Sequence, residues 1–334
     1  MVRLIDVANR AGVSLGAASV VLSGGKKSSI RVSAEKRERI LAAAEELNYI
    51  PNISAQRLCG HSSHTIGVLV DSEDAAVRFR QLAAIEREAD RRGYRLLIAE
   101  AHENPGKQLL NCQTLFQYGV DAVICHANNM DSEVMTQKKV VFFGAEPLVG
   151  LPCVYSDIRM GYAEAAAQFH REARRKTVLL IGEQELKYDA LRARRKAFGE
   201  VFPEGKVYTI PDRANDPESV REVFGKFVES VLIPEKTDAV IAQNDLWCMT
   251  LAGELLRCGK RIPQEISLVG QDNSEFCCSR YPALSTIDPN LEAFGKAVVE
   301  LALERILHPE TPVRSIAVPT KLILRETTQN RRLV

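Results

Sequence analysis

The sequence lacks the features that define several large classes of protein. None of its apolar runs approaches the ~20 residues that a membrane-spanning helix needs, and the N-terminus MVRLIDVANRAG has no signal-peptide core. No G-x-G-x-x-G follows a strand pattern, and G-x-S-x-G, H-E-x-x-H and the P-loop are absent, which argues against dinucleotide binding and against familiar enzyme mechanisms. We therefore expect a cytoplasmic protein that has no membrane contact and is not an enzyme.

Cysteine and histidine are present but not grouped. None of the eight cysteines forms a C-x-x-C pair, and the six histidines are dispersed along the 334 residues. A metal site needs clustered ligands, so we expect buried free thiols, no metal and no cofactor. The cysteines are Cys59, Cys112, Cys125, Cys153, Cys248, Cys258, Cys277 and Cys278.

Positive charge is concentrated near the N-terminus. Residues 1–65 hold nine Lys or Arg against five Asp or Glu, whereas the remainder holds 35 against 38. A basic head on a slightly acidic body indicates a polyanionic partner for the head alone, with an ordinary solvated surface as the alternative.

The first 46 residues show the spacing of a helix-turn-helix. Small and apolar residues recur on one face between Leu4 and Ala11, and Gly12 supplies the backbone freedom of a tight turn. Ser14 can then cap a second helix whose inner face is Ala18, Val21 and Leu22, and Ser33 opens a third helix. A generic three-helix bundle is the alternative.

Several motifs, in order, closely resemble the lactose-repressor (LacI/GalR) family of bacterial transcription regulators. They are IDVANRAGVS, VSAEKRERILAAAEELNYIPN, SAQRL and SSHTIGVLV, and the resemblance continues to Thr327. It implies an all-α helix-turn-helix headpiece (1–50), a hinge (51–63) and an α/β core like that of periplasmic binding proteins. The core would have an N-terminal lobe (64–158 and 292–318) and a C-terminal lobe (159–291 and 319–330). The resemblance also implies a homodimer that binds a near-palindromic operator in double-stranded DNA under the control of a small-molecule effector.

The helix that would read DNA has few polar side chains. The family commonly has Thr-Val-Ser-Arg where this chain has Ala17, Ala18, Ser19 and Val20, so bidentate reading of a base is not available from it. We expect reading by shape and by contact with thymine methyl groups, with phosphate contacts from hydroxyls and from the basic loop SGGKKSSIR. The candidate DNA-binding residues here are Ser14, Leu15, Gly16, Ala17, Ser19, Val20, Lys26, Lys27 and Arg31.

The hinge offers a second source of selectivity. Pro51 separates the third helix from NISAQRLCG, which resembles the family's short hinge helix. Leu58 falls where the family inserts a leucine into the minor groove, a wedge that unstacks a base step; core packing is the alternative. Asn52 and Ala55 lie on the same short helix and complete the candidate contacts.

From Thr65 onward the pattern is that of an α/β protein. Apolar strands such as TIGVLV, VDAVICHA, TVLLIG and ISLVGQ alternate with helical stretches, including 78–92, 159–173, 216–232 and 246–258. This alternation predicts parallel sheets with helices on both faces, here as two doubly wound lobes with the chain crossing near 158–162, 288–292 and 318–321. Ligands of such sheets bind outside the carboxyl ends of the strands.

Polar residues at those ends are the candidate ligand contacts. By resemblance, Asp272 after ISLVGQ and Arg194 in LRARRKAF face the ligand, and Asn244 after DAVIAQ is a plausible hydroxyl contact while Asp245 caps the next helix. Arg78 and Phe79 stand near positions where the family often places stacking aromatics; Arg78 and Arg194 can each instead face solvent.

Two arginines favour an anionic group and Asp272 favours hydroxyls, so a sugar acid or sugar phosphate fits better than a plain sugar or a purine. The favoured function is a ligand-controlled transcription regulator, most simply a repressor. The alternative is a small-molecule binding protein whose degenerate headpiece no longer reads DNA specifically.

Overall fold

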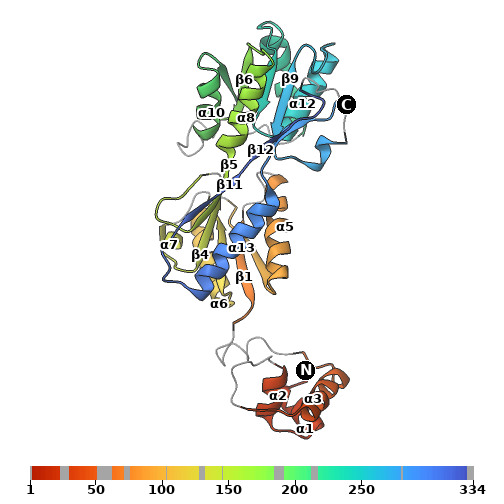
Figure 1. Cartoon of the computed structure of the whole chain (residues 1–334), viewed down its shortest axis with the longest axis vertical. Helices are drawn as coiled ribbons and strands as arrows, with labels where there is room; N and C mark the ends of the chain where they lie inside the picture. Colours follow the sequence, from red (N-terminus) through yellow and green to blue (C-terminus); the bar gives the residue numbers. More distant parts are fainter. Residues whose placement is uncertain are drawn as a thin grey trace. The chain divides into compact units, whose positions relative to one another are not determined.

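The chain forms two compact units, which we call the headpiece (Met1–His64) and the core (Thr65–Val334). A computed structural model shows their elements (Figure 1). It describes residues 2–22, 30–50, 62–70, 76–102, 104–127, 132–144, 146–183, 192–211, 217–279 and 281–328.

The headpiece contains the predicted helix-turn-helix. Its helices are α1 (Leu4–Ala11), α2 (Leu15–Leu22) and α3 (Ala34–Glu46). Gly12 ends α1 in the left-handed conformation with a φ of 65°, and the amide of Val13 donates to the carbonyl of Ala8 (3.0 Å). The chain bends by 108° between α1 and α2, as expected for this motif.

Small apolar side chains let the three helices pack closely. The buried cluster combines residues from each helix, and ion pairing between Arg10 of α1 and Glu46 of α3 closes its edge. The start of α1 has no Ser or Thr cap; instead the carboxylate of Asp6 accepts from the amide of Arg3 (2.8 Å). The cluster consists of Val7, Ala8, Ala11, Ala18, Val21, Ile40 and Ala43.

No single described helix is long and apolar enough to cross a bilayer, and only α1 and α2 taken together, as a bent pair, satisfy that test by length and composition.

The first sheet of the core belongs to the N-terminal lobe and has the strand order β11-β5-β4-β3-β1-β2, all parallel. Helices α5 (Ala76–Arg91) and α13 (Leu291–Leu307) cover one face, and α6 (Pro105–Gln117) and α7 (Ser132–Met135) cover the other (Figure 1). The strands are β1 (Thr65–Val70), β2 (Arg95–Glu100), β3 (Ala122–His126), β4 (Val140–Gly144), β5 (Cys153–Asp157) and β11 (Ser315–Pro319).

The second sheet belongs to the C-terminal lobe and has the order β12-β10-β9-β8-β6-β7, parallel except for the β10–β12 pair. One face packs against α8 (Ile158–Arg171) and α10 (Ala193–Val201), the other against α11 (Pro217–Phe227), a π-helical turn (Val228–Leu232) and α12 (Asp245–Arg257). The strands are β6 (Thr177–Gly182), β7 (Lys206–Ile210), β8 (Ala239–Ala242), β9 (Ser267–Gln271), β10 (Ser285–Asp288) and β12 (Lys321–Ile323). The expected pair of doubly wound lobes is confirmed.

The chain passes between the lobes at three places: between β5 and α8, between β10 and α13, and between β11 and β12. Thr320 joins two of these crossings, because its hydroxyl donates to the carbonyl of Asp157 (2.7 Å) and accepts from the amide of Gly161 (3.0 Å). A Cβ atom at Gly161 would lie 2.2 Å from Ile287 Cγ2, so the crossings pack too closely for any side chain there.

Candidate functional sites

The exposed face of α2 is small and mostly apolar. Leu15 is 47% exposed, and Ser19 and Val20 are partly exposed, whereas Ala17 is only 9% exposed and lies against the other helices. Of the expected contacts on this helix, Leu15, Ser19 and Val20 therefore offer more surface to a base than Ala17 does. Gly16 packs against Ile30, whose Cδ1 would lie 3.2 Å from an added Cβ.

The start of α2 offers positions for an anion. The hydroxyl of Ser14 accepts from the amide of Ala17 (3.2 Å), which caps the helix. A cavity of about 490 Å³ next to this helix start is lined by Ser14, Asn9, Gly12 and the basic side chain of Lys36, among others. Helix N-termini and lysines both attract phosphate.

The other expected DNA contacts lie outside α2. Arg31 is exposed ahead of α3. The remaining ones, Lys26, Lys27, Asn52, Ala55 and Leu58, lie outside the described residues.

In the core, Asp272 lies at the carboxyl end of β9 in a rare backbone conformation, with a φ of 104°. The following loop is fixed by Asp245, whose carboxylate accepts from the amide of Ser274 (2.7 Å), the hydroxyl of Thr286 (2.6 Å) and the thiol of Cys277 (3.1 Å). Burial raises the pKa of Asp245, and these donors oppose that rise.

Two side chains at the start of α12 bind the backbone around it. Asn244, expected as a hydroxyl contact, caps the helix by accepting from the amide of Trp247 (2.8 Å). Asp245, expected as that cap, clamps the loop instead. Asn244 fits the cap because its extended backbone places the side chain over the first turn.

Arg194 lies inside the C-terminal lobe and is not exposed on a basic helix. It is 7% exposed, donates from Nε to the hydroxyl of Tyr162 (3.0 Å) and donates from Nη2 to the side-chain oxygen of Gln271 (3.0 Å). Gln271 in turn donates to the carboxylate of Asp272 (3.2 Å). Arg194, Gln271 and Asp272 therefore form one continuous polar chain at the end of β9.

Arg78 of the N-terminal lobe acts on the same carboxylate through its charge. It is half-buried in the first turn of α5 and donates to Gln81 (3.1 Å). The pKa of Asp272 is raised to about 6 by burial and by the charge of Asp245, while Gln271, Arg194 and Arg78 act in the opposite direction. Asp272 thus lies within the electrostatic reach of an arginine from each lobe. Phe79 is 59% exposed.

Two residues at this place were not expected from the sequence. His126 ends β3 and is 6% exposed, and its Nδ1 has no hydrogen-bond partner among the described residues. Burial and the charge of Arg78 hold its pKa well below the usual range, so the ring is neutral. Arg80 donates from Nη1 to the backbone carbonyl of Asp272 (2.6 Å). His126 carries the sequence signal that identified Asp272, a polar residue at the carboxyl end of a buried strand.

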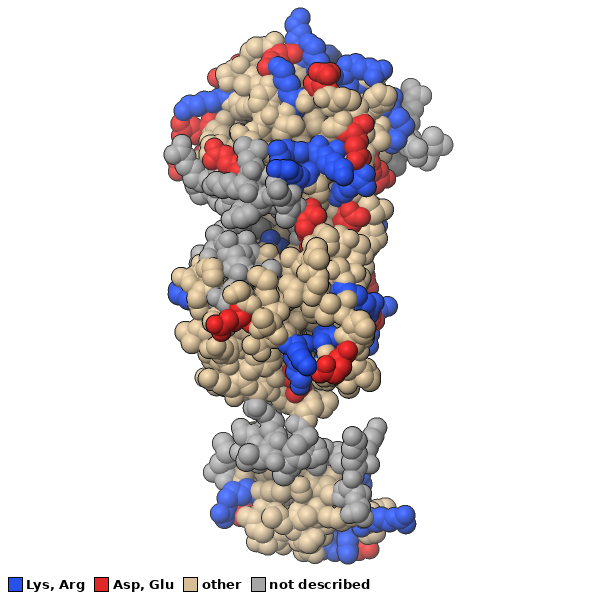
Figure 2. Space-filling model, turned by 90° about the vertical axis from the view of Figure 1, so that its left-hand side faces the viewer, with Lys and Arg blue, Asp and Glu red and all other residues tan. Residues whose placement is uncertain are grey.

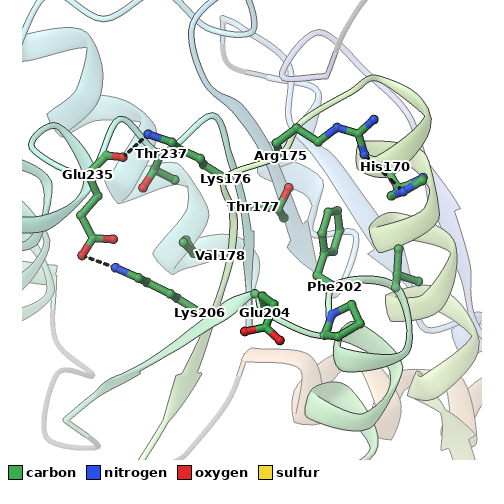
Figure 3. A pocket seen from close by; sticks show the side chains of 13 residues that line it. His170, Arg175, Lys176, Thr177, Val178, Phe202, Glu204, Lys206, Glu235 and Thr237 are labelled. Carbon is green, nitrogen blue, oxygen red and sulfur yellow. Dashed lines mark hydrogen bonds and ion pairs between the residues drawn. The ribbon is translucent and has the colours of Figure 1, made fainter.

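A second cavity lies at the opposite, amino-terminal edge of the C-terminal sheet (Figure 3). It has a volume of about 540 Å³, and its charged side chains interact mainly with one another: Lys206 pairs with Glu235 (2.7 Å), and Arg175 lies 3.3 Å from His170.

The C-terminal lobe shows charges of both signs on the face in Figure 2, and the N-terminal lobe shows few there. Within the described ranges, no three His, Cys, Asp or Glu residues are grouped as a metal would require.

Comparison with known proteins accounts for both units. Residues 3–52 match the bacterial regulatory proteins of the lacI family, and residues 166–328 match a periplasmic binding protein-like domain. The ribose operon repressor of Bacillus subtilis is 32% identical over 338 residues, which is 98% of this chain and 99% of that protein. The chain belongs to the lacI family.

Further lacI-family relatives agree in function and in fold. The transcriptional repressor PurR of Photobacterium profundum is 24% identical, with 99% of both chains covered. The crystal structure of the lac repressor dimer bound to operator and the anti-inducer ONPF has the same fold, with a TM-score of 0.84 at 23% identity, covering 98% of this chain and 99% of that one. This protein is therefore a ligand-responsive transcriptional repressor and not an enzyme.

Proposed function

We propose that a homodimer of this lacI-family repressor binds a near-palindromic operator and is controlled by a sugar acid or sugar phosphate held between its lobes. The proposed boundaries are 1–50 for the headpiece, 51–63 for the hinge, 64–158 with 292–318 for the N-terminal lobe, and 159–291 with 319–330 for the C-terminal lobe. The observation that carries the proposal is that Asp272 is linked to Arg194 of one lobe through Gln271 and lies within the electrostatic reach of Arg78 of the other.

The DNA contacts divide into backbone contacts and a weaker reading of bases. Ser14, Lys36 and Arg31 surround or precede helix starts where phosphates bind well. Leu15 and Val20 would contact thymine methyl groups. Most of the affinity would then come from phosphates and from the hinge, and it would fall steeply with salt.

Exposed apolar side chains on both lobes support a dimer. On the N-terminal lobe, the edge strand β2 exposes Leu97 and Ile98. On the C-terminal lobe, Leu256, Phe276 and Tyr281 are exposed. An uncovered apolar edge strand invites association, and a second copy of the chain is the partner that the family's two-fold operators require.

The chemistry around Asp272 supports a polyol that carries a negative charge. The carboxylate can accept from neighbouring hydroxyls, and Arg78 and Arg194 present planar donor groups that suit a carboxylate or a phosphate. The similarity to a ribose operon repressor supports a sugar-derived effector. Closure of the lobes on this molecule would change the spacing of the two hinges and so the affinity for DNA.

Calorimetric titration with D-ribose, D-ribose 5-phosphate, D-glucuronate and hypoxanthine tests the effector class. We expect an anionic sugar to bind best, and to bind about 10- to 100-fold more weakly to Arg78→Ala and to Arg194→Ala, because each variant removes a charged donor. Arg87→Ala, at an exposed position on α5, is the matched control. Equal binding of neutral ribose by the parent and both variants, with no anion preferred, would contradict the charge argument.

A further inference from the structure

The two lobes are connected by the side chain of Arg80 as well as by the three crossings of the main chain. Arg80 belongs to α5 of the N-terminal lobe, whereas its acceptor, the backbone carbonyl of Asp272, belongs to the C-terminal lobe. Neither residue lies on a crossing segment. At 2.6 Å this is a short hydrogen bond from a charged donor in a partly buried place, the kind that contributes most to holding two surfaces together.

The acceptor has a fixed direction within its own lobe. The amide of Asp272 donates to Ile287 (3.0 Å), and the side-chain oxygen of Asn273 accepts from Arg325 (2.8 Å). Asp245 holds Ser274, one residue further on. Because these contacts all lie within the C-terminal lobe, the carbonyl of Asp272 cannot turn to follow α5, and separation of the lobes breaks the bond.

We propose that Arg80 is a positioning residue that holds the two halves of the effector site together before the effector binds. Arg78 and Arg80 lie two residues apart on α5, and Asp272 supplies both the carbonyl that Arg80 binds and the carboxylate that Arg78 influences. The bond therefore sets the distance between the donors of one lobe and the acceptor of the other. An effector that meets two lobes already held near each other loses less of its binding free energy to ordering them when it closes the site.

The inference rests on the proposed effector site, but its first test needs no effector. Small-angle X-ray scattering of the ligand-free full chain compares the parent with Arg80→Ala, Arg80→Lys and the control Arg87→Ala. We expect a larger radius of gyration for Arg80→Ala, a smaller increase for Arg80→Lys, which keeps one charged donor, and no change for the control. Circular dichroism melting shows whether each variant is folded.

The second test measures binding of D-ribose 5-phosphate by calorimetry. We expect about 10- to 100-fold weaker binding to Arg80→Ala, with Arg80→Lys in between and Arg87→Ala unchanged. If the parent binds neither this probe nor D-glucuronate, the proposed effector class fails, and scattering alone decides the role of Arg80. Unchanged scattering of a folded Arg80→Ala, or binding as tight as the parent's, overturns the inference.

Discussion

Asp272 is the residue at which function conflicts most with folding. Its φ of 104° is a backbone conformation that residues other than glycine rarely adopt. Burial and the charge of Asp245 raise the pKa of its carboxyl group to about 6. Because the folded protein holds a proton that the unfolded chain releases at lower pH, this group favours folding below pH 4. That contribution is lost as the pH rises through about 6.

Replacing this carboxyl group with an amide should therefore stabilise the protein near neutral pH. We expect Asp272→Asn to raise the free energy of unfolding by up to about 3 kcal/mol at pH 7.5 and to have little effect at pH 4, while weakening effector binding. Urea unfolding across this pH range measures the difference, with the exposed Glu86→Gln as control. A gain that is the same at every pH would show that relief of backbone strain, and not the charge, is responsible.

The sequence indicates a site residue where that residue stands within a recognisable run. Asp272 and Arg194 occur within recognisable runs, and the structure joins them through Gln271. The role of Arg80 could not be read from the sequence, because its partner is a backbone carbonyl 192 residues further along the chain and a carbonyl leaves no signature. His126 stands at the carboxyl end of a buried strand, but no family motif surrounds it as one surrounds Asp272.

Helix α2 departs from the motif that the lacI family commonly has at this place. Val20 is partly exposed on this helix, at the position where the family commonly has an arginine. We expect Val20→Arg to change the sequences that the chain selects from a random pool of duplexes, because an arginine that reaches guanine adds ~1–3 kcal/mol of discrimination.

Ala42→Arg, at an exposed position of α3, adds the same charge outside the reading helix and is the control. It should leave the selected sequence unchanged. An unaltered site for Val20→Arg would mean that position 20 faces no base, and a parent that enriches no site would favour the degenerate-headpiece alternative.

Most of the strands that could be predicted are buried on both faces. Strands β1, β3, β4, β6, β8 and β9 are nearly continuous apolar runs, as parallel strands in the middle of a sheet are expected to be. By contrast, β7 and β12 are short edge strands with Lys at their first residue, and β11 is another edge strand with exposed side chains. Their periodicity is too weak to distinguish them from loops, and only pairing with a neighbour defines them.

For the whole molecule, the proposed dimer depends on apolar surface that would otherwise contact water. Ile98 of β2 is 49% exposed, and a charge at this position would face the partner copy. We expect Ile98→Asp to shift sedimentation from dimer to monomer and to weaken operator binding about 10²- to 10⁴-fold, since the two headpieces would no longer bind as one unit.

Leu307→Asp, at an exposed position at the end of α13, is the control for the added charge. It should remain a dimer. If Ile98→Asp sediments as a dimer and binds the operator normally, the association surface lies elsewhere on the core.

The three crossings also determine how such repressors can exchange parts. Each lobe is assembled from separate stretches of chain, so a single recombination event between two relatives cannot transfer an intact lobe. A junction at β5 and α8 would pair β5 of one parent with β11 of the other, and α5 of one with α13 of the other. The contact between α5 and α13 leaves no room for a larger residue, because a Cβ atom at Gly295 would lie 2.5 Å from the carbonyl of Ala84. New effector specificities should therefore arise mainly by point substitution around Asp272, and a hybrid that transfers a lobe must replace both of its segments together.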